Sequence, residues 1–198
     1  MDEDVMTGMQ RMAEETLARL GALREGHFRL TSGLHSNRYM QCAALFEHPA
    51  ESAALCRALA DRFRGRGIGV VAGPALGGVI MAYETARALG ARNIFAEREG
   101  GKMTFRRGFT VGRGERALAV EDVVTTGGSV REVVELLREA GAEVVGVGAV
   151  VDRSGGRADF GVPFHALVSM EAETWAEEDC PLCREGLPIV KPGSRRTA

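Results

Sequence analysis

The middle of the chain alternates short, continuous runs of apolar residues with amphipathic stretches of helical period. The apolar runs cover residues 68–73, 93–97, 116–124, 144–152 and 163–170. Amphipathic helices are expected between them at 77–90 and 129–141. A strand that is apolar on both sides is buried on both faces, as in a parallel sheet covered by helices. The pattern therefore predicts an α/β fold with a central, mainly parallel sheet and right-handed crossovers.

The flanking segments are read with the same periodicities. Helices are expected over 9–23 and from Pro49 to about residue 65. The stretch 26–46 is polar, aromatic and rich in turn residues, which favours short strands or ordered loops. Residues 98–115 combine glycines and charges without a helical period and are expected to form a hairpin or a mobile excursion. No repeat or second domain is evident, so we expect one domain over residues 1–198.

Charge and hydropathy exclude several classes of protein. The net charge is −2 and the isoelectric point is about 6.1, so the basic footprint of a nucleic-acid binder is missing. No apolar run approaches the ~18 residues of a membrane span. The acidic start is unlike a signal peptide, and four cysteines without one are read as reduced thiols. We therefore expect a cytoplasmic protein without nucleic-acid or membrane partners.

Two adjacent carboxylates and a loop of hydroxyls and glycines follow the apolar strand 116–124. Glu121 and Asp122 come first, and Thr125-Thr126-Gly127-Gly128-Ser129 then opens a helix. Ligands bind at the carboxyl ends of such strands, where loop amides and the helix N-terminus form a phosphate cradle. The motif matches neither G-x-G-x-x-G nor G-x-x-x-x-G-K-[ST]. An ordinary helix cap is the alternative, although one hydroxyl would suffice for it.

The two carboxylates are expected to play different roles, because successive residues on a strand point to opposite sides. A second glycine-rich turn, Gly73-Pro74-Ala75-Leu76-Gly77-Gly78, also joins a strand to a helix. Glycine allows close approach of the backbone to a ligand and proline stiffens the turn. A tight turn without a ligand is the alternative for this segment.

Lysine is rare in this chain. Of 25 basic residues only Lys102 and Lys191 are lysines, and the others are arginines. A lysine offers a compact point charge that the planar guanidinium does not, so a surviving lysine is a functional candidate. Lys102 lies in the charged segment 98–115 and is the candidate we favour, whereas Lys191 is read as accidental.

The Cys180-Pro-Leu-Cys183 segment resembles half of a zinc knuckle. A structural zinc site takes four ligands, and Cys42 and Cys56 lack a metal-site spacing. We therefore expect a metal-free turn at Cys180–Cys183, the alternative being that two such halves meet across a dimer to bind zinc. The histidines are expected to be surface or packing residues; they are His27, His35, His48 and His165.

These motifs together resemble a known family. Residues 120–129 resemble the phosphoribosyl-diphosphate (PRPP) signature of the type I phosphoribosyltransferases, and residues 72–78 resemble the family's pyrophosphate loop. Residues 26–39 are similar to the amino-terminal segment of the orotate phosphoribosyltransferases. Val151-Asp152-Arg153 resembles the Asp-Arg that follows the next strand in that subfamily. The resemblance covers residues 20–155.

The resemblance implies a fold, a reaction and partners. It implies a small N-terminal hood over about residues 1–45 and an Mg-dependent transfer of the phosphoribosyl group from PRPP to orotate, giving orotidine 5′-monophosphate and pyrophosphate. It also implies a homodimer in which the loop 98–115 is shared between subunits. The sugar passes through an oxocarbenium-like state, so catalysis depends on positioning and on stabilising the leaving pyrophosphate.

Residue roles are implied in the same way, with Mg²⁺ held mainly by PRPP and water and with no protein metal ligand. The catalytic residues would be Lys102, Glu121 and Asp122. The 5′-phosphate would be bound by Thr125, Thr126, Gly127, Gly128 and Ser129. The pyrophosphate would be bound by Gly73, Pro74, Ala75, Leu76, Gly77, Gly78, Arg98 and Arg106. Orotate would be bound by Phe28, Thr31, Ser32, Gly33, Tyr39, Thr125 and Arg153.

Two segments depart from the family's usual pattern. Arg98, Lys102, Arg106 and Arg107 replace the commoner basic segment, so any of them is a candidate for the catalytic cation. Thr31 stands where many relatives have lysine. Two other functions remain open: transfer to another base, and a nucleotide-sensing regulator that binds RNA or DNA on the same scaffold. The balanced charge and the lack of an added domain disfavour the regulator.

Overall fold

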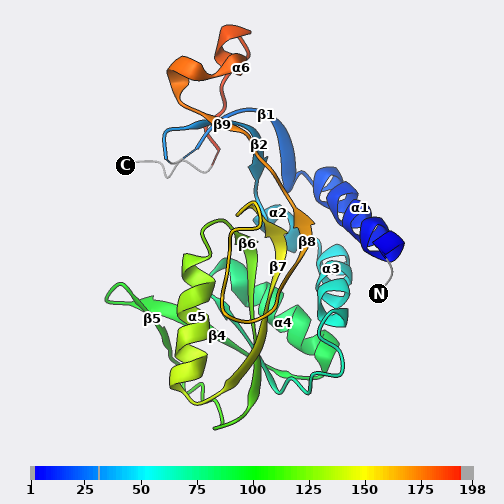
Figure 1. Cartoon of the computed structure of the whole chain (residues 1–198), viewed down its shortest axis with the longest axis vertical. Coiled ribbons are helices and arrows are strands. Elements are labelled where there is room, and N and C mark those ends of the chain that lie inside the picture. Colours follow the sequence, from blue (N-terminus) through cyan, green and yellow to red (C-terminus); the bar gives the residue numbers. More distant parts are fainter. Residues whose placement is uncertain (1–2, 31, 193–198) are drawn as a thin grey trace.

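The computed structural model describes residues 3–30 and 32–192 (Figure 1). A six-stranded sheet forms its centre, in the order β5-β4-β3-β6-β7-β8, and all pairs are parallel except β4 with β5. The strands are β3 (Val70–Pro74), β4 (Arg92–Glu99), β5 (Lys102–Phe105), β6 (Arg116–Val124), β7 (Glu143–Asp152) and β8 (Phe164–Ser169). The predicted α/β class and the mainly parallel sheet are confirmed.

Helices cover both faces of this sheet. One face packs against α1 (Glu3–Arg19), α3 (Pro49–Asp61) and α4 (Gly77–Leu89), and the other against α5 (Gly128–Glu139). Neighbouring strand residues divide between the two cores: Val71 and Leu118 face the first, and Val70 and Ala119 face α5. This division explains why the strands read as continuous apolar runs. None of the described helices is long and apolar enough to cross a membrane.

A second, three-stranded antiparallel sheet forms the hood above the main sheet (Figure 1). It consists of β1 (Leu23–Arg29), β2 (His35–Met40) and β9 (Thr174–Trp175), followed by η1 (Glu177–Asp179) and α6 (Pro181–Arg184). The short helix α2 (Ala43–Phe46) leads back to the body. The expected N-terminal hood over about residues 1–45 is therefore corrected in two respects. Its first helix, α1, packs on the body, and C-terminal strand β9 completes the hood sheet.

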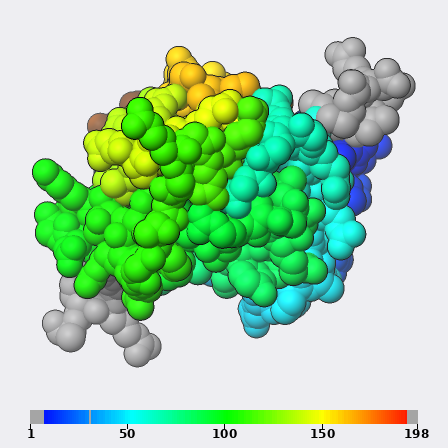
Figure 2. Space-filling model, turned by 90° about the horizontal axis from the view of Figure 1, so that it is seen from below, coloured from blue at the N-terminus to red at the C-terminus, as the bar shows by residue number. Residues whose placement is uncertain are grey.

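The excursion at 98–115 begins as a β-hairpin. Strands β4 and β5 pair antiparallel with Glu99 opposite Lys102, and Gly100 and Gly101 between them have φ values of 57° and 85°. Two successive positive φ values define the tight turn that matches the twist of a hairpin. The hairpin projects from the body at the left in Figure 1, and the same green projection is visible at the left edge of Figure 2.

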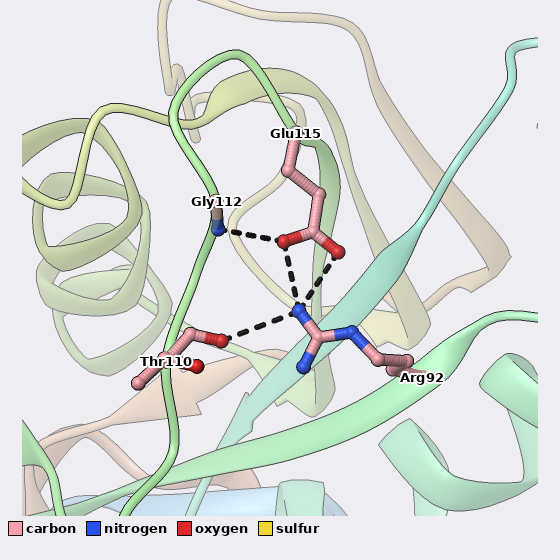
Figure 3. A network of polar contacts seen from close by, with 4 residues as sticks. All are labelled: Arg92, Thr110, Gly112 and Glu115. Atoms are coloured by element: carbon pink, nitrogen blue, oxygen red, sulfur yellow. Dashed lines mark hydrogen bonds and ion pairs between the residues drawn. The ribbon is translucent and has the colours of Figure 1, made fainter.

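The return loop after the hairpin is held against β4 (Figure 3). Both carboxylate oxygens of Glu115 accept hydrogen bonds from Arg92 at 2.8 Å, and the same guanidinium donates to the Thr110 carbonyl at 3.2 Å. The Gly112 amide donates to Glu115 at 2.8 Å, and Phe109 packs edge-on against Phe95. The base of the hairpin is thus fixed to the body.

Candidate active site

A cavity of about 740 Å³ lies between the hood and the carboxyl ends of the central strands. Its walls come from the β1–β2 turn, β2, the loops after β6 and β7, β9 and the end of the described chain. The lining residues are Leu30, Ser32, Leu34, Tyr39, Met40, Thr125, Thr126, Arg153, Arg157, Ala172, Thr174 and Pro192. Ser32, Tyr39, Thr125, Thr126 and Arg153, all singled out from the sequence, are brought together here.

Arg153 is held in place at the floor of this cavity. Its amide donates to the Val124 carbonyl at 2.7 Å, and the neighbouring Asp152 carboxylate accepts the Ser154 amide at 2.7 Å. Burial lowers the pKa of the Arg153 guanidinium, which remains cationic as arginine does in proteins. Its buried Nε has no hydrogen-bond partner among the described residues. Because an unpaired buried donor is costly, this atom indicates a place for an anionic ligand.

The hood contributes Tyr39 and its support. The Phe28 ring is only 2% exposed and packs behind Tyr39 with 5.7 Å between ring centroids, so Phe28 lies outside the cavity lining. Tyr39 donates from its hydroxyl to Gln41 at 3.1 Å. Gly33 sits in the exposed turn between β1 and β2 with φ at 88°. Thr31 lies outside the described residues.

Arg157 is a second guanidinium in the cavity that the sequence reasoning missed. It follows Gly155 and Gly156 in the loop after β7, at the carboxyl end of a central strand. Ligands bind at that edge of an open α/β sheet, so its position was the available signal. The cavity therefore offers two cations to a ligand with more than one anionic group.

The loop between β6 and α5 is open to the same cavity. Gly127 occupies the helix cap with φ at 75°, and the Phe160 ring packs so closely that a Cβ there would lie 2.8 Å from it. The N-cap residue Gly127 has no side chain with which to cap this helix end. Thr125, Thr126 and Gly128 are exposed. The hydroxyls of Thr125 and Thr126 therefore do not serve as an ordinary helix cap, and they remain available to bind a phosphate.

Glu121 and Asp122 occupy different surroundings, as the strand alternation indicates. Glu121 accepts hydrogen bonds from the Val130 amide and the Ser129 hydroxyl in the first turn of α5. Burial, together with the negative charge of Asp122, nevertheless raises the pKa of Glu121 to about 7. Asp122 accepts the Val123 amide at 3.0 Å, and burial raises its pKa as well.

The turn at residues 73–78 contributes to a second cavity of about 410 Å³. Gln41, Ala43, Phe46, Glu47, Leu76, Gly77, Ile80 and Asp122 line it. A Cβ at Gly77 would lie 2.7 Å from the Asp122 carboxylate, so only glycine allows this approach. A Cβ at Gly73 would lie 2.5 Å from the Gly78 carbonyl. Gly73 and Gly78 therefore pack against each other. This packing requires glycine at both positions, in addition to the expected close approach of the backbone to a ligand.

The basic residues of the hairpin are engaged within their own chain. Arg98 donates to Glu132 at 2.6 Å and to the Gly101 carbonyl at 2.8 Å, and Arg107 donates to Glu97 at 2.8 Å. Arg106 pairs with Glu99 at 3.5 Å. Lys102 lines a surface hollow beside three α5 glutamates, namely Glu132, Glu135 and Glu139. The partners of the hairpin cations thus differ from the residues of the two cavities.

The paired cavities and the strand-loop-helix of β6 and α5 define a class. The family described as "Phosphoribosyl transferase domain" matches residues 41–175, so the chain belongs to the phosphoribosyltransferases. The orotate phosphoribosyltransferase of Pelotomaculum thermopropionicum is 61% identical over 176 residues, covering 89% of this chain and 93% of that protein. The orotate phosphoribosyltransferase of Caldanaerobacter subterraneus is 56% identical over 182 residues, covering 92% of this chain and 96% of that protein.

Structural comparison agrees with these relatives. The crystal structure of orotate phosphoribosyltransferase from Aeropyrum pernix superposes with a TM-score of 0.67 at 26% identity, over 80% of this chain and 93% of that one. The chain belongs to the orotate phosphoribosyltransferase family.

Proposed function

We propose that this chain transfers the phosphoribosyl group of PRPP to orotate, giving orotidine 5′-monophosphate and pyrophosphate in pyrimidine biosynthesis. One observation carries the assignment: the open loop Thr125–Thr126 and the unpartnered Arg153 line the same cavity. The loop fits the 5′-phosphate of the sugar. Arg153 fits the orotate carboxylate, because a guanidinium pairs with a carboxylate through two parallel hydrogen bonds.

The reaction exchanges one bond at the anomeric carbon of the ribose. The bond to the pyrophosphate oxygen breaks, a bond to a ring nitrogen of orotate forms, and the proton of that nitrogen leaves with the pyrophosphate. Glu121 and Asp122 hold the ribose hydroxyls beside the positive charge that develops on the sugar, where a carboxylate is most stabilising. Asp122 also borders the second cavity with Leu76 and Gly77, which we assign to the departing pyrophosphate. The two cavities thus hold the two ends of PRPP on either side of the reacting carbon.

Mg²⁺ is the cofactor we propose. It prefers oxygen ligands and keeps several waters, and the Asp122 carboxylate on the wall of the second cavity provides one oxygen donor group there. Mg²⁺ is usually held by one or two carboxylates together with substrate phosphates rather than by an all-protein cage. The ion therefore arrives mainly with PRPP, and it neutralises the charge of the leaving pyrophosphate.

We further propose a cytoplasmic homodimer that shares its active sites. Leu76, the residue before α4, and Ile80 and Tyr83 on α4 form an apolar strip and are 88%, 45% and 56% exposed; the first two also line the second cavity. Exposed apolar strips of this kind typically mark protein interfaces. The hairpin that carries Lys102 projects away from its own body (Figure 1), which suits a contact with the partner's site. The cysteines are free thiols, as in proteins of a reducing compartment.

The assignment is tested by following orotate loss and pyrophosphate release with purified protein, PRPP and Mg²⁺. Uracil, adenine, hypoxanthine and guanine serve as competing bases under the same conditions. We expect turnover with orotate only, and none after Mg²⁺ is omitted until it is added back. Turnover with another base would overturn the pocket assignment, and PRPP binding without turnover of any base would favour the regulator.

Replacing Arg153 with alanine is expected to raise KM for orotate by about ten- to a hundredfold, because a charge-assisted hydrogen bond contributes about 1.5–3 kcal/mol. KM for PRPP should change little. Steady-state kinetics with each substrate varied in turn measure both values. Arg64→Ala is the control, since Arg64 is an exposed arginine paired with Asp61 at the surface. Equal rises in both KM values would contradict an orotate-specific role for Arg153.

A further inference from the structure

Two histidines and two cysteines from opposite ends of the sequence meet in the hood. His27 lies on β1, and His35 is the first residue of β2. Cys180 is the residue before α6, and Cys183 lies within that helix. One ligand atom from each residue lies within 4.8 Å of all the others. His27 Nε2 is 3.0 Å from His35 Nδ1, Cys180 Sγ is 3.5 Å from His27 Nε2, and Cys183 Sγ is 3.3 Å from His35 Nδ1.

These separations are close to the edges of a tetrahedron around a zinc ion. With Zn–N near 2.05 Å and Zn–S near 2.3 Å, tetrahedral coordination gives N···N edges of about 3.3 Å and S···N edges of about 3.6 Å. In the structure the N···N edge is 3.0 Å, and three of the four S···N edges are 3.3, 3.5 and 3.7 Å. Each differs from the tetrahedral value by about 0.3 Å or less.

A hydrogen bond to the backbone orients His27 for coordination. His27 Nδ1 lies 2.9 Å from the Leu187 carbonyl. A carbonyl oxygen only accepts hydrogen bonds, so Nδ1 carries the proton and donates it. The lone pair of His27 is therefore on Nε2, the atom that faces both sulfurs. A backbone carbonyl that fixes the tautomer in this way is the usual second partner of a metal-bound histidine. His35 turns Nδ1 into the cluster.

Burial and chemistry select the metal. His27 is 4% exposed, His35 1% and Cys180 is fully buried, so an ion here would be shielded from water. Two imidazoles and two thiolates in tetrahedral array are the ligand set of Zn²⁺. None of the four residues lines the cavity assigned to PRPP and orotate. Because the protein fills all four positions, the ion would be structural.

Apart from the pairing of β9 with β2, the segment of residues 171–192 has little else to hold it. Cys180 is the one buried residue among residues 171–192, and Leu187, Ile189 and Val190 are nearly half exposed. Two backbone hydrogen bonds tie Val190 to the hairpin, to His27 and Arg29 at 2.8 and 2.9 Å. A segment that buries so little apolar surface typically needs a disulfide or a metal for stability.

We propose that His27, His35, Cys180 and Cys183 bind one structural Zn²⁺ per chain and thereby fasten the C-terminal segment to the hood hairpin. The site replaces the metal-free turn expected from the sequence, where only the two cysteines were recognisable as ligands. The hairpin between the histidines carries Ser32 and Leu34, and residues Thr174 and Pro192 flank the cysteines; all four line the large cavity. The zinc site therefore also fixes the walls of that cavity.

The test is the metal content of the full chain, purified without a metal-affinity tag or chelator and measured by inductively coupled plasma mass spectrometry. We expect about one zinc per chain in the wild type and less than about a tenth of that in Cys183→Ser and in His35→Ala. His48→Ala is the matched control and should keep its zinc, because His48 precedes α3 on the body. Wild-type protein without stoichiometric zinc that also fails to take up added Zn²⁺ would overturn the proposal.

A second measurement does not depend on the folding of variants. Exchange of Co²⁺ into the wild-type chain is expected to give the visible absorption of tetrahedral cobalt and the ultraviolet band of cobalt-thiolate bonds. Zinc added afterwards should abolish both signals. Octahedral cobalt without thiolate bonds, or a Cys180–Cys183 disulfide found by mass spectrometry in protein purified under reducing conditions, would contradict the site.

Discussion

The Lys102→Ala enzyme is expected to lose about 10²–10³-fold in kcat, the usual effect of removing one group that stabilises charge in a transition state. Pyrophosphate leaves with negative charge, and a lysine ammonium placed on it acts only as that charge develops. The KM values for both substrates should change much less. Initial rates of orotate consumption over a range of PRPP concentrations measure kcat and KM separately.

Lys191→Ala provides a matched control, because Lys191 is the only other lysine of the chain. It should keep wild-type kcat. Lys102→Arg should recover part of the activity, since it keeps the charge but not its compact shape. If Lys102→Ala is as active as Lys191→Ala, the catalytic cation is another hairpin residue, and Arg106→Ala is the next variant to measure.

Mixed dimers separate a shared site from a self-contained one. Combining equal amounts of Lys102→Ala and Asp122→Asn subunits makes about half of the dimers mixed. If the hairpin enters the partner's site, each mixed dimer has one intact site and one doubly substituted site, so the mixture regains about a quarter of wild-type activity. A mixture no more active than its parents shows that Lys102 serves its own chain.

Replacing Glu121 with glutamine is expected to lower kcat/KM for PRPP by about 10²-fold while making the free enzyme more stable at pH 8. Burial raises the pKa of Glu121 to about 7 from its ordinary 4.5. As the pH rises, the Glu121 carboxyl therefore loses its proton at a lower pH in the unfolded chain than in the native state. The stability of the native state therefore falls as pH rises from about 4.5 to 7. A shift of this size corresponds to about 3 kcal/mol.

Glutamine keeps an oxygen acceptor for the Val130 amide and Ser129 but removes the charge. We expect Glu121→Gln to be about 1–3 kcal/mol more stable than wild type at pH 8 and equally stable at pH 4, allowing for solvent screening at this partly exposed site. Urea unfolding at both pH values measures the difference. Glu171→Gln, at an exposed position, should show no pH-dependent change.

The activities of the wild type and of Glu121→Gln test the role of the negative charge on Glu121. Wild-type kcat/KM for PRPP should fall below pH 7 as Glu121 takes up a proton, and the ratio of wild type to Glu121→Gln should fall with it. Dividing the two profiles removes the ionisation of the substrates, which is common to both. A ratio that is constant from pH 5.5 to 8.5, values chosen to bracket a pKa of about 7, would show that Glu121 acts without its charge.

Local sequence patterns were enough to predict the central strands and helices, whose structure depends on residues close together in the sequence. Strands β6 and β7, helix α5 and the loop between β6 and α5 follow from apolar runs, a helical period and turn residues. The hairpin at Gly100 and Gly101 was one of two expected alternatives. The cavity residues Tyr39 and Arg153 were found through motif resemblance, because no local pattern places them side by side.

Long-range pairing set the limit of prediction. Strand β9 has two residues, too few for any periodicity, and its place beside β2 depends on the whole intervening body. The same pairing brings Cys180 to His27, so only the Cys180 and Cys183 half of the four-residue cluster has a local signature. The contact between Gly73 and Gly78 is local in sequence, but it could not be predicted either, because it forms only when the turn closes.

The hood is assembled from both ends of the described chain, and this has a consequence for synthesis on the ribosome. A growing chain that has emerged up to residue 170 already contains every strand of the main sheet and the phosphate loop. It still lacks Thr174 and Pro192 from the cavity wall and the two cysteines that hold them. The nascent enzyme can therefore fold its catalytic body early, but its cavity closes only after residues 171–192 have also emerged.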